Sequence, residues 1–385
     1  MQYKQYLLIF LSLFFLLCLS ALSLSFYANP YDIDSFLSPK GSISYFGGTR
    51  TAKAVHIVKG DYDAFILGSS RSEIGINPRH RLWGSLKAYN ASLAGSNFIE
   101  THKVFQTIIK HKQPKLIMLA LDYGLFSEAR STSADFTLSR FDDSNNAFSS
   151  FFKEHFSKES IEKSFRTLKY TAKGLPAKHK QGQKLGELTF SDTIDNGEQH
   201  ELILNTLEKK VINNNETYSS KGYSSDRLRL LKELIKTCLD HEINLMIVIS
   251  PVHTLQLITF KQMGIWENFL TWKQEIVSLT SAPNNIPLYD FTDLSTVISE
   301  TVPTEKTSTP MKWFWETSHY KESMGDLILS RVMAPSSPIE PSFGVKLTSE
   351  NIDFEIAKQR IKLEEYEQKN SELYSTVLSL IKPNS

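Results

Sequence analysis

Short runs of apolar residues, each bounded by turn-forming residues, recur along the middle of the chain. Five such runs lie at 63–68, 87–92, 116–123, 243–250 and 286–292. In "LIMLAL" and "LMIVI" the apolar residues are consecutive, a pattern typical of strands that are buried on both faces of a parallel sheet. Segments 97–112, 226–241 and 266–280 lie between runs and carry apolar residues at helical spacing. The pattern predicts an α/β fold in which helices cover a parallel sheet in three layers.

One uncharged apolar segment precedes this pattern. From Tyr6 to Tyr27 no residue is charged, and about 20 apolar residues suffice to cross a bilayer. Cleaved signal peptides have a shorter apolar core of about 7–15 residues. The length therefore favours an uncleaved transmembrane anchor over residues 1–28, with a signal peptide and a buried soluble helix as alternatives. Lys4 favours a cytoplasmic N-terminus, which would place the rest of the chain on the periplasmic side of the inner membrane.

Changes in composition mark further boundaries. Residues 29–51 are rich in Pro, Gly and Ser and predict a juxtamembrane linker, followed by an α/β domain over 52–335. Within this domain, about 131–224 is polar, which predicts an insertion with one or two helices, for example at 160–173. It is interpreted as a lid or binding surface, with tolerated disorder as the alternative. In the extension 336–385, a capping box at Thr348 or Ser349 predicts the start of a long charged helix.

Composition and charge exclude several classes of protein. The chain has 385 residues, of which 41% are hydrophobic and 22% charged, so it is not a disordered chain. Its 43 basic and 42 acidic residues give a net charge of +1 without a basic block, which argues against nucleic acid as a partner. Cys18 and Cys238 suggest neither a disulfide framework nor a zinc knuckle. We expect no metal and no cofactor, since the sequence has neither metal-ligand spacing nor a glycine-rich phosphate loop.

Polar residues follow the ends of the predicted strands, where ligands bind in a parallel sheet. Gly68 to Arg71 follow the first strand, and a serine in the first turn of a helix lies beside N–H groups that carry partial positive charge. Gly95, after the second strand, allows its N–H to approach a ligand closely. Glu316 precedes His319 by three residues, so one loop can deliver a base and the carboxylate that orients it. Ser70, His319 and Glu316 are therefore candidate catalytic residues.

The blocks "ILGSSRS", "YNASLAGSN" and "WETSHY" followed by "GD" resemble those of the SGNH/GDSL hydrolase superfamily. Within it, the chain is similar to the membrane-anchored branch that includes the alginate O-acetylation proteins and the D-alanyl transfer protein of teichoic acid. The resemblance extends from about Asp63 to Met333. It implies a flavodoxin-like α/β/α sandwich, with Ser70 as the nucleophile, His319 as the general base, and the N–H groups of Ser70 and Gly95 in the oxyanion hole.

The chain departs from the superfamily's pattern at two positions. Glu316 stands where an Asp is common, and it is one methylene longer but able to hold His319 through the same hydrogen bond. Asp122 stands where many members have an Asn that donates to the oxyanion, and a carboxylate only accepts hydrogen bonds. Asn97 is the alternative donor. Because the loss of one oxyanion donor costs about 10²–10³ in rate, the site is predicted to be slow, specialised or inactive.

Arg71, His253 and Asp122 are candidate substrate-binding residues. Arg71 is predicted to hold an anionic group such as a uronate or phosphate, or to pair with Glu73 or Asp122. His253, which follows the fourth strand, either contacts the substrate or caps the next helix.

The leading hypothesis is an inner-membrane-anchored, periplasmic SGNH-like esterase or O-acyltransferase. It would act on acyl groups of a cell-envelope glycan or a lipid-linked precursor, with a membrane-bound acyltransferase as a candidate partner. The alternative is a catalytically inactive SGNH-fold module for binding or assembly in envelope polysaccharide modification or export. A third hypothesis is metal-dependent hydrolysis by Glu316, His319 and Asp122.

Overall fold

The computed structural model describes residues 2–32, 45–137, 139–142, 146–212, 218, 222–303, 309–334 and 343–381. Contacts between residues divide the chain into two compact units. Unit 1 comprises Met1–Gly60 and Ala134–Gly182, and unit 2 comprises Asp61–Ser133 and Gln183–Ser385. These units do not follow the boundaries expected from composition, because residues 52–60 and the first part of the predicted insertion group with the apolar N-terminal helix.

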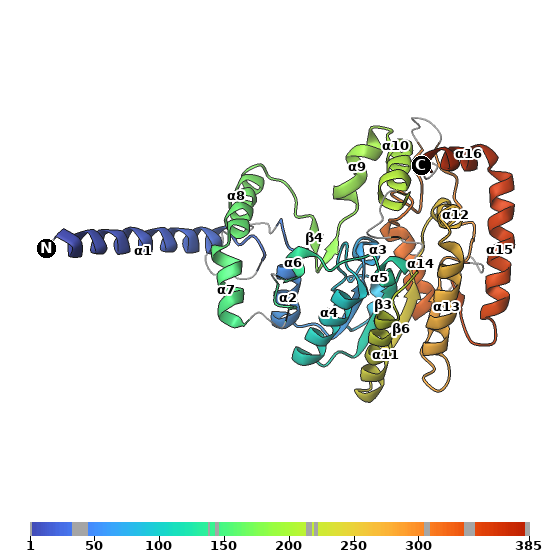
Figure 1. Cartoon of the computed structure of the whole chain (residues 1–385), viewed down its shortest axis with the longest axis horizontal. Coiled ribbons are helices and arrows are strands. Elements are labelled where there is room, and N and C mark those ends of the chain that lie inside the picture. Colours follow the sequence, from blue (N-terminus) through green and yellow to red (C-terminus); the bar gives the residue numbers. More distant parts are fainter. Residues whose placement is uncertain are drawn as a thin grey trace. The chain divides into compact units, whose positions relative to one another are not determined.

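Unit 1 is mostly helical. It contains α1 (Gln2–Ala28), α2 (Arg50–Lys59), α6 (Ala134–Thr137), α7 (Ala147–Phe156), α8 (Lys158–Ala172) and the short strand β4 (His179–Lys180). The helix α1 is long and apolar enough to cross a membrane, as the sequence predicts (Figure 1). The helix α8 corresponds to the helix expected at 160–173, and Ser157 caps it by accepting a hydrogen bond from the Ser160 N–H.

The centre of unit 2 is a six-stranded sheet. Its strands are β1 (Ala64–Gly68), β2 (Ala88–Asn90), β3 (Leu116–Leu121), β6 (Asn244–Ile249), β7 (Leu288–Asp290) and β8 (Val345–Lys346), in the order β2-β1-β3-β6-β7-β8. The first five strands in this order are parallel to their neighbours, and β8 is antiparallel to β7. Every residue of β1 and β3 is buried. The prediction of an α/β fold with a mainly parallel sheet is confirmed, and each of the five apolar runs contains a strand.

Helices connect and cover the strands of unit 2 (Figure 1). In chain order they are α3 (Ser70–Gly75), the 3₁₀ helix η1 (Arg81–Trp83), α4 (Phe98–His111), α5 (Tyr123–Phe126), α9 (Glu187–Asp195), α10 (Gln199–Asn205), the π-helix η2 (Thr206–Ile212), α11 (Ser225–Asp240), α12 (Thr254–Gln262), α13 (Trp266–Thr280), α14 (Glu322–Met333), α15 (Ile352–Lys369) and α16 (Ser371–Leu380), with the short strand β5 (Gln183–Lys184) before α9. The helices expected at 97–112, 226–241 and 266–280 are α4, α11 and α13. The expectation of one or two helices in 131–224 is wrong, because several short helices form there.

The C-terminal extension begins differently from the predicted capping box. The Thr348 hydroxyl accepts from the Glu350 N–H at 3.3 Å, and the Asn351 side chain accepts from the Thr348 N–H at 2.8 Å. These local turns occupy the capping groups, so the helix α15 begins only at Ile352. The predicted long helix is in fact two helices, α15 and α16, which meet at Asn370.

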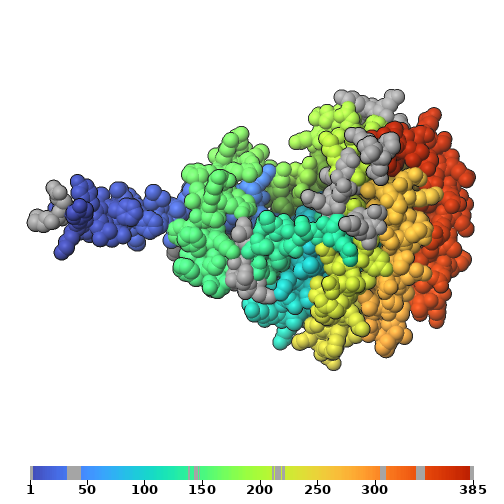
Figure 2. Space-filling view, in the orientation of Figure 1, coloured from blue at the N-terminus to red at the C-terminus, as the bar shows by residue number. Residues whose placement is uncertain are grey.

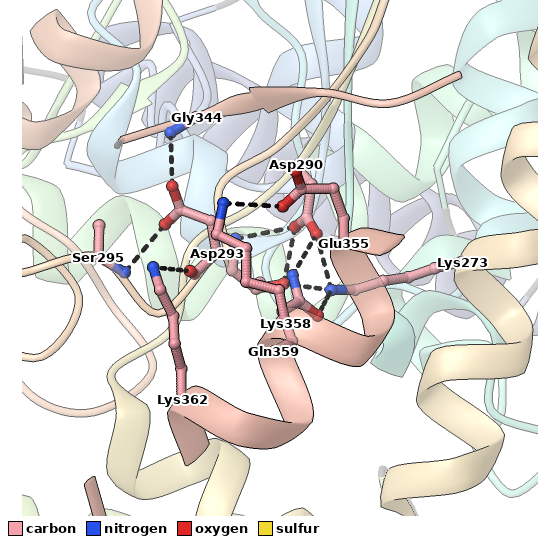
Figure 3. Close-up of polar contacts among 10 residues, drawn as sticks. Lys273, Asp290, Asp293, Ser295, Gly344, Glu355, Lys358, Gln359 and Lys362 are labelled. Atoms are coloured by element: carbon pink, nitrogen blue, oxygen red, sulfur yellow. Dashed lines mark hydrogen bonds and ion pairs between the residues drawn. The ribbon is translucent and has the colours of Figure 1, made fainter. Parts of the chain in front are cut away.

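A buried lysine joins α15 to the end of the sheet (Figure 3). Lys273 of α13 has a side chain that is 1% exposed, and its ammonium donates to Asp290 and Thr292, each at 2.7 Å, and to Gln359 of α15 at 2.8 Å. Gln359 in turn donates to Asp290 at 2.9 Å. Because the carboxylate, the hydroxyl and the amide oxygen accept all three of these bonds, the buried charge is paired and α15 is held in place.

The pKa values of the two carboxylates near this lysine are shifted in opposite directions. Burial alone would raise the pKa of Asp290, but the Lys273 ammonium and hydrogen bonds from Thr292 outweigh it and hold that pKa below its ordinary value. Asp293 lies beyond the reach of this lysine's hydrogen bonds, and burial together with the charge of Asp290 raises its pKa to about 6. Asp290 is therefore the carboxylate that balances the charge of Lys273.

We expect the substitution Lys273→Met to lower the free energy of unfolding of unit 2 by about 3–5 kcal/mol, since it leaves the Asp290 carboxylate buried without its cation. Urea denaturation followed by tryptophan fluorescence measures this, because all five tryptophans belong to unit 2. Arg360→Met is the matched control: it removes an exposed ion pair between α15 and Glu267 of α13 and should cost less than about 1 kcal/mol. Equal losses in the two variants would contradict the assigned role of Lys273.

Candidate active site

The strand order of unit 2 reverses at β1. Its two neighbours are β2 and β3, so the chain leaves β1 toward one side of the sheet and returns to the other side for β3. In open parallel sheets, ligands bind beyond the carboxyl ends of the strands at such a reversal. Ser69, which follows β1, is the N-cap of α3, and Ser70 is the first residue of this helix. Asp122 directly follows β3. The fold therefore places two of the candidate residues where a ligand site is expected.

Ser70, His319 and Glu316 lie in hydrogen-bond contact. The Ser70 Oγ is 2.8 Å from the His319 Nε2, and the His319 Nδ1 pairs with a Glu316 carboxylate oxygen. Glu316 is fully buried, and its other oxygen accepts from the Ser318 N–H at 2.7 Å. The His319 side chain keeps 13% of its surface exposed. The arrangement is a hydroxyl, an imidazole and a carboxylate in series, the geometry by which a base activates a nucleophile.

The loop that carries His319 is held by a short hairpin. The Trp315 N–H donates to the His319 carbonyl at 2.9 Å, and the Lys321 N–H donates to the Trp313 carbonyl at 2.8 Å. At its start, the Glu300 carboxylate accepts three backbone N–H groups, those of residues 312, 313 and 314. These bonds fix His319 and Glu316 on one segment. Glu300 carried no sequence signal, since its role depends on contacts across a loop.

Two glycines allow α3 and α14 to approach closely. A Cβ atom on Gly325 of α14 would lie 1.8 Å from the Gly75 carbonyl oxygen, and a Cβ on Gly75 would lie 1.9 Å from the Tyr320 ring. Both distances are far below van der Waals contact. Because α3 begins with Ser70 and α14 follows His319, this contact brings the candidate nucleophile and the candidate base together. Sequence reasoning noted Gly325 only within the resembling block and missed Gly75.

The adjacent serine has a different environment. The Ser69 Oγ donates to Asp122 at 2.5 Å and accepts from the Arg71 N–H at 3.3 Å, so it caps α3. Ser70 instead faces His319. The structure therefore separates the two hydroxyls, and Ser70 is the one next to a base.

Arg71 pairs with Asp122, which was one of the two alternatives raised by the sequence. The Arg71 Nη1 lies 3.3 Å from the Asp122 Oδ1, and the side chains of Arg71 and Asp122 are 7% and 5% exposed, respectively. Arg71 also donates to the Ser318 carbonyl at 3.1 Å and to the Tyr218 hydroxyl at 2.9 Å. Burial opposes its charge, but Tyr218 and Asp122 outweigh burial and raise the pKa of Arg71. The guanidinium thus links the Ser70 corner to the His319 loop, and each of its three nitrogens has a partner within the protein.

Asn97 is used as a helix cap. Its Oδ1 accepts from the Glu100 N–H at 3.0 Å, and its Nδ2 donates to the Arg130 carbonyl at 3.3 Å and to Thr132 at 3.1 Å. The prediction of Asn97 as an oxyanion donor is therefore wrong, because the start of α4 and the segment after α5 already occupy both ends of the amide.

Gly95 lies in an exposed turn with a φ of +67°, a conformation that favours glycine. The Leu93 N–H donates to the Gly68 carbonyl at 2.9 Å, which ties this turn to the corner before Ser70. The Asn90 side chain also connects the end of β2 to α3, because its amide donates to the carbonyls of Ser72 and Ile76. Its buried amide was not singled out from the sequence. The role of the Gly95 N–H in an oxyanion hole stays a prediction.

His253 caps α12 rather than facing a substrate. Its Nδ1 accepts from the Leu255 N–H at 3.2 Å, its Nε2 lies 2.9 Å from the Glu300 carbonyl, and the residue is fully buried. Burial lowers its pKa to about 4. The substrate-binding prediction is wrong, and the capping alternative is confirmed.

An apolar cluster borders the site. Phe190 of α9 stacks on Trp315 with ring centroids 5.5 Å apart, and its ring centroid lies 6.1 Å from that of His319. Ile74 and Ile194 complete the cluster. These side chains form an apolar surface beside the imidazole. Sequence reasoning had assigned α9 only to a polar insertion.

In the hypothesis of a metal site, the groups that would bind the ion already have other partners, since His319 Nδ1 pairs with Glu316. The His319 Nε2 faces Ser70, and the Asp122 oxygens are bound by Ser69 and Arg71. Within the part of the chain that the structure describes, no group of three or more His, Cys, Asp or Glu side chains is arranged to hold a metal ion.

Comparisons with known proteins do not assign the chain to a family. No protein-family model matches it, and no curated protein matches it. The geometry of the residues described above is therefore the basis for a functional proposal.

The substitution Gly325→Ala should force α14 away from α3 and misalign Ser70 and His319. We expect the rate at which a serine-directed fluorophosphonate reacts with Ser70 to fall by about 100-fold, since displacements near 1 Å cost that much in positioned reactions. Ser323→Ala, on the exposed first turn of the same helix, is the control and should keep the wild-type rate. An unchanged rate in Gly325→Ala would show that the close contact does not position the site.

His253 should make unit 2 less stable in acid. The folded protein holds this imidazole neutral down to about pH 4, whereas the unfolded chain protonates it near its ordinary pKa of about 6.5. Its contribution to stability is therefore present above about pH 6.5 and declines as the pH falls. Relative to His253→Asn, which retains a capping acceptor, the wild type should lose about 2–3 kcal/mol between about pH 6.5 and 4.5. Urea denaturation at each pH measures the difference, and parallel stability curves would contradict the assignment.

Proposed function

We propose that the chain is a membrane-anchored serine esterase or O-acyltransferase of the SGNH type. The observation that carries the proposal is the series Ser70 Oγ, His319 and Glu316, with 2.8 Å between the hydroxyl and the imidazole Nε2. A serine hydroxyl is a weak nucleophile by itself, and a base held by a buried carboxylate is what activates it for attack on an acyl carbonyl.

The sheet supports the flavodoxin-like layout that the resemblance implies. Numbered along the chain, the five parallel strands β2-β1-β3-β6-β7 have the order 2-1-3-4-5, which is the order of flavodoxin-like folds. Helices α4 and α11 pack against each other and against β1 and β6. In this layout Ser70 lies at the reversal of strand order, where such folds bind ligands.

The proposed reaction passes through an acyl-enzyme. Ser70 Oγ attacks the acyl carbonyl carbon while the His319 Nε2 takes its proton, and Glu316 stabilises the imidazolium that forms. The N–H groups of Ser70 and Gly95 would bind the oxyanion. His319 then gives the proton to the leaving alcohol, and a water or a sugar hydroxyl attacks the acyl-serine, with the same histidine as base.

The location of the enzyme would restrict its substrates. With α1 as an anchor and Lys4 on the cytoplasmic side, the catalytic unit would face the periplasm. We propose acyl groups on a cell-envelope glycan or a lipid-linked precursor as substrates, with a membrane-bound acyltransferase as a partner.

A second candidate function is a binding or assembly module of the same fold. Asp122, which stands in place of an oxyanion donor, has its oxygens bound by Ser69 and Arg71, and removal of one such donor costs about 10²–10³ in rate. A site weakened to this extent would suit a protein that binds acylated glycans without turning them over.

Reaction with a fluorophosphonate separates the two functions. We expect covalent labelling of the wild type and turnover of p-nitrophenyl acetate, with both lost in Ser70→Ala. Glu316→Gln should retain the fold and lower turnover by about 10²–10⁴, because an amide does not stabilise the imidazolium.

Ser69→Ala is the matched control, since it removes the neighbouring hydroxyl that caps α3 rather than the one that faces His319. It should still be labelled. A folded wild type that is not labelled would favour the binding module, and labelling that persists in Ser70→Ala would exclude Ser70 as the nucleophile.

A further inference from the structure

The exposed apolar part of α1 ends where α7 and α8 pack against it. From Tyr3 to Leu19 the helix is exposed apart from the half-buried Cys18, whereas Ser25 and Ala28 are buried. Both α7 and α8 contact α1. Figure 2 shows α1, in dark blue, projecting clear of the rest of unit 1, with the green α7–α8 segment gathered at its end.

Specific contacts fix α7 to the last turns of α1. The His155 Nδ1 of α7 lies 3.0 Å from the Ser25 hydroxyl, and its ring stacks on Phe26 with centroids 4.6 Å apart. In Figure 1, α7 runs across the direction of α1 rather than along it. A bilayer spanned by α1 would therefore have α7 lying along its surface.

One face of α7 carries exposed phenylalanines. Phe148, Phe151 and Phe152 are 78%, 38% and 54% exposed, and we call them the α7 phenylalanine face. Together with His155 they have the spacing i, i+3, i+4 and i+7, which places them on one side of a helix. The side of α7 that touches α1 at His155 thus continues, toward the start of α7, as an exposed aromatic surface.

The length of α1 places this surface near a membrane boundary. The exposed stretch from Tyr3 to Leu19 covers about 25 Å at ~1.5 Å per residue, and the hydrocarbon core of a bilayer is about 30 Å thick. A core that begins near Tyr3 would end within the turn after Leu19. Beyond Ser20, Ala21 and Leu22 are half-buried, and the contacts of Ser25 and Phe26 with His155 of α7 follow within about one turn.

We propose that the α7 phenylalanine face inserts into the lipid interface at the membrane surface from which α1 emerges. The inference rests on the proposed anchor and adds a second lipid contact to it. Aromatic side chains on one face of a surface-lying helix are suited to the boundary between headgroups and acyl chains. Residues 146–173 have six basic and three acidic side chains, a net charge of +3, which favours anionic headgroups.

A second contact changes how unit 1 is held. A single spanning helix leaves a domain free to turn about the helix axis. An attached helix that lies along the surface removes that freedom, because turning would pull its apolar side chains out of the interface. Unit 1 would then keep one orientation relative to the membrane.

Nitroxide labels test the proposal on the full chain in vesicles of phosphatidylethanolamine and phosphatidylglycerol. In a background of Cys18→Ala and Cys238→Ala, labels are placed by Phe148→Cys or, in a separate chain, Phe152→Cys. Collisions with oxygen, which concentrates in the bilayer, are compared with collisions with a water-soluble nickel chelate. Leu11→Cys on α1 is the control for the bilayer, and Lys236→Cys on α11, 73% exposed, is the control for water.

We expect oxygen collisions to exceed nickel collisions severalfold at Leu11, Phe148 and Phe152, and the reverse at Lys236. Nickel collisions that dominate at both Phe positions while Leu11 stays protected would overturn the inference and leave the anchor intact. Nickel collisions that dominate at Leu11 would overturn the anchor, and the inference with it. Loss of one Phe variant to misfolding leaves the other as a complete test.

Discussion

The contact between α3 and α14 at Gly75 and Gly325 is the constraint on which the candidate site depends. Ser70 and His319 are 249 positions apart in the sequence and come from different strand ends. Their side chains reach each other because α3 and α14 pack so closely that the Gly75 carbonyl lies against Gly325. A Cβ atom at Gly325 would clash with this carbonyl. The hairpin around His319 and the cap on α3 then remove the remaining freedom of the two groups.

Two buried ion pairs near the carboxyl ends of the strands hold neighbouring segments of unit 2 in place. Arg71 and Asp122 pair beneath the nucleophile corner, and Lys273 and Asp290 pair beside the end of β7. In each pair the remaining polar atoms find partners, which is the condition under which a buried ion pair is tolerated. These pairs specify a geometry: the first connects the Ser70 corner with the His319 loop, and the second holds α15 against the sheet.

Asp122 at the carboxyl edge of the sheet distinguishes the candidate site from the pattern that the sequence resembles. Asp122 occupies the position after β3 as an acceptor, and it is needed there to pair with Arg71 and to hold Ser69. Replacement of Asp122 by a donor would leave the buried guanidinium without its anion. In the proposed reaction an oxyanion would therefore be bound by backbone N–H groups, which depend on the turn at Gly95 and the first turn of α3.

The features that depend on local pattern can be predicted from the amino-acid sequence alone. Consecutive apolar residues predicted the five parallel strands, helical spacing predicted α4, α11 and α13, and the uncharged segment predicted an N-terminal helix able to cross a membrane. The sequence also singled out Ser70, His319 and Glu316, because residue types at strand ends are readable in a linear chain. The roles that depend on partners far away in the sequence become visible only in the folded chain. Asn97 and His253 proved to be helix caps, Arg71 joined Asp122, and α7 turned a phenylalanine face outward beside α1. The same side chain serves as a ligand, a cap or an ion-pair partner according to the groups packed around it, and chain folding alone brings those groups together.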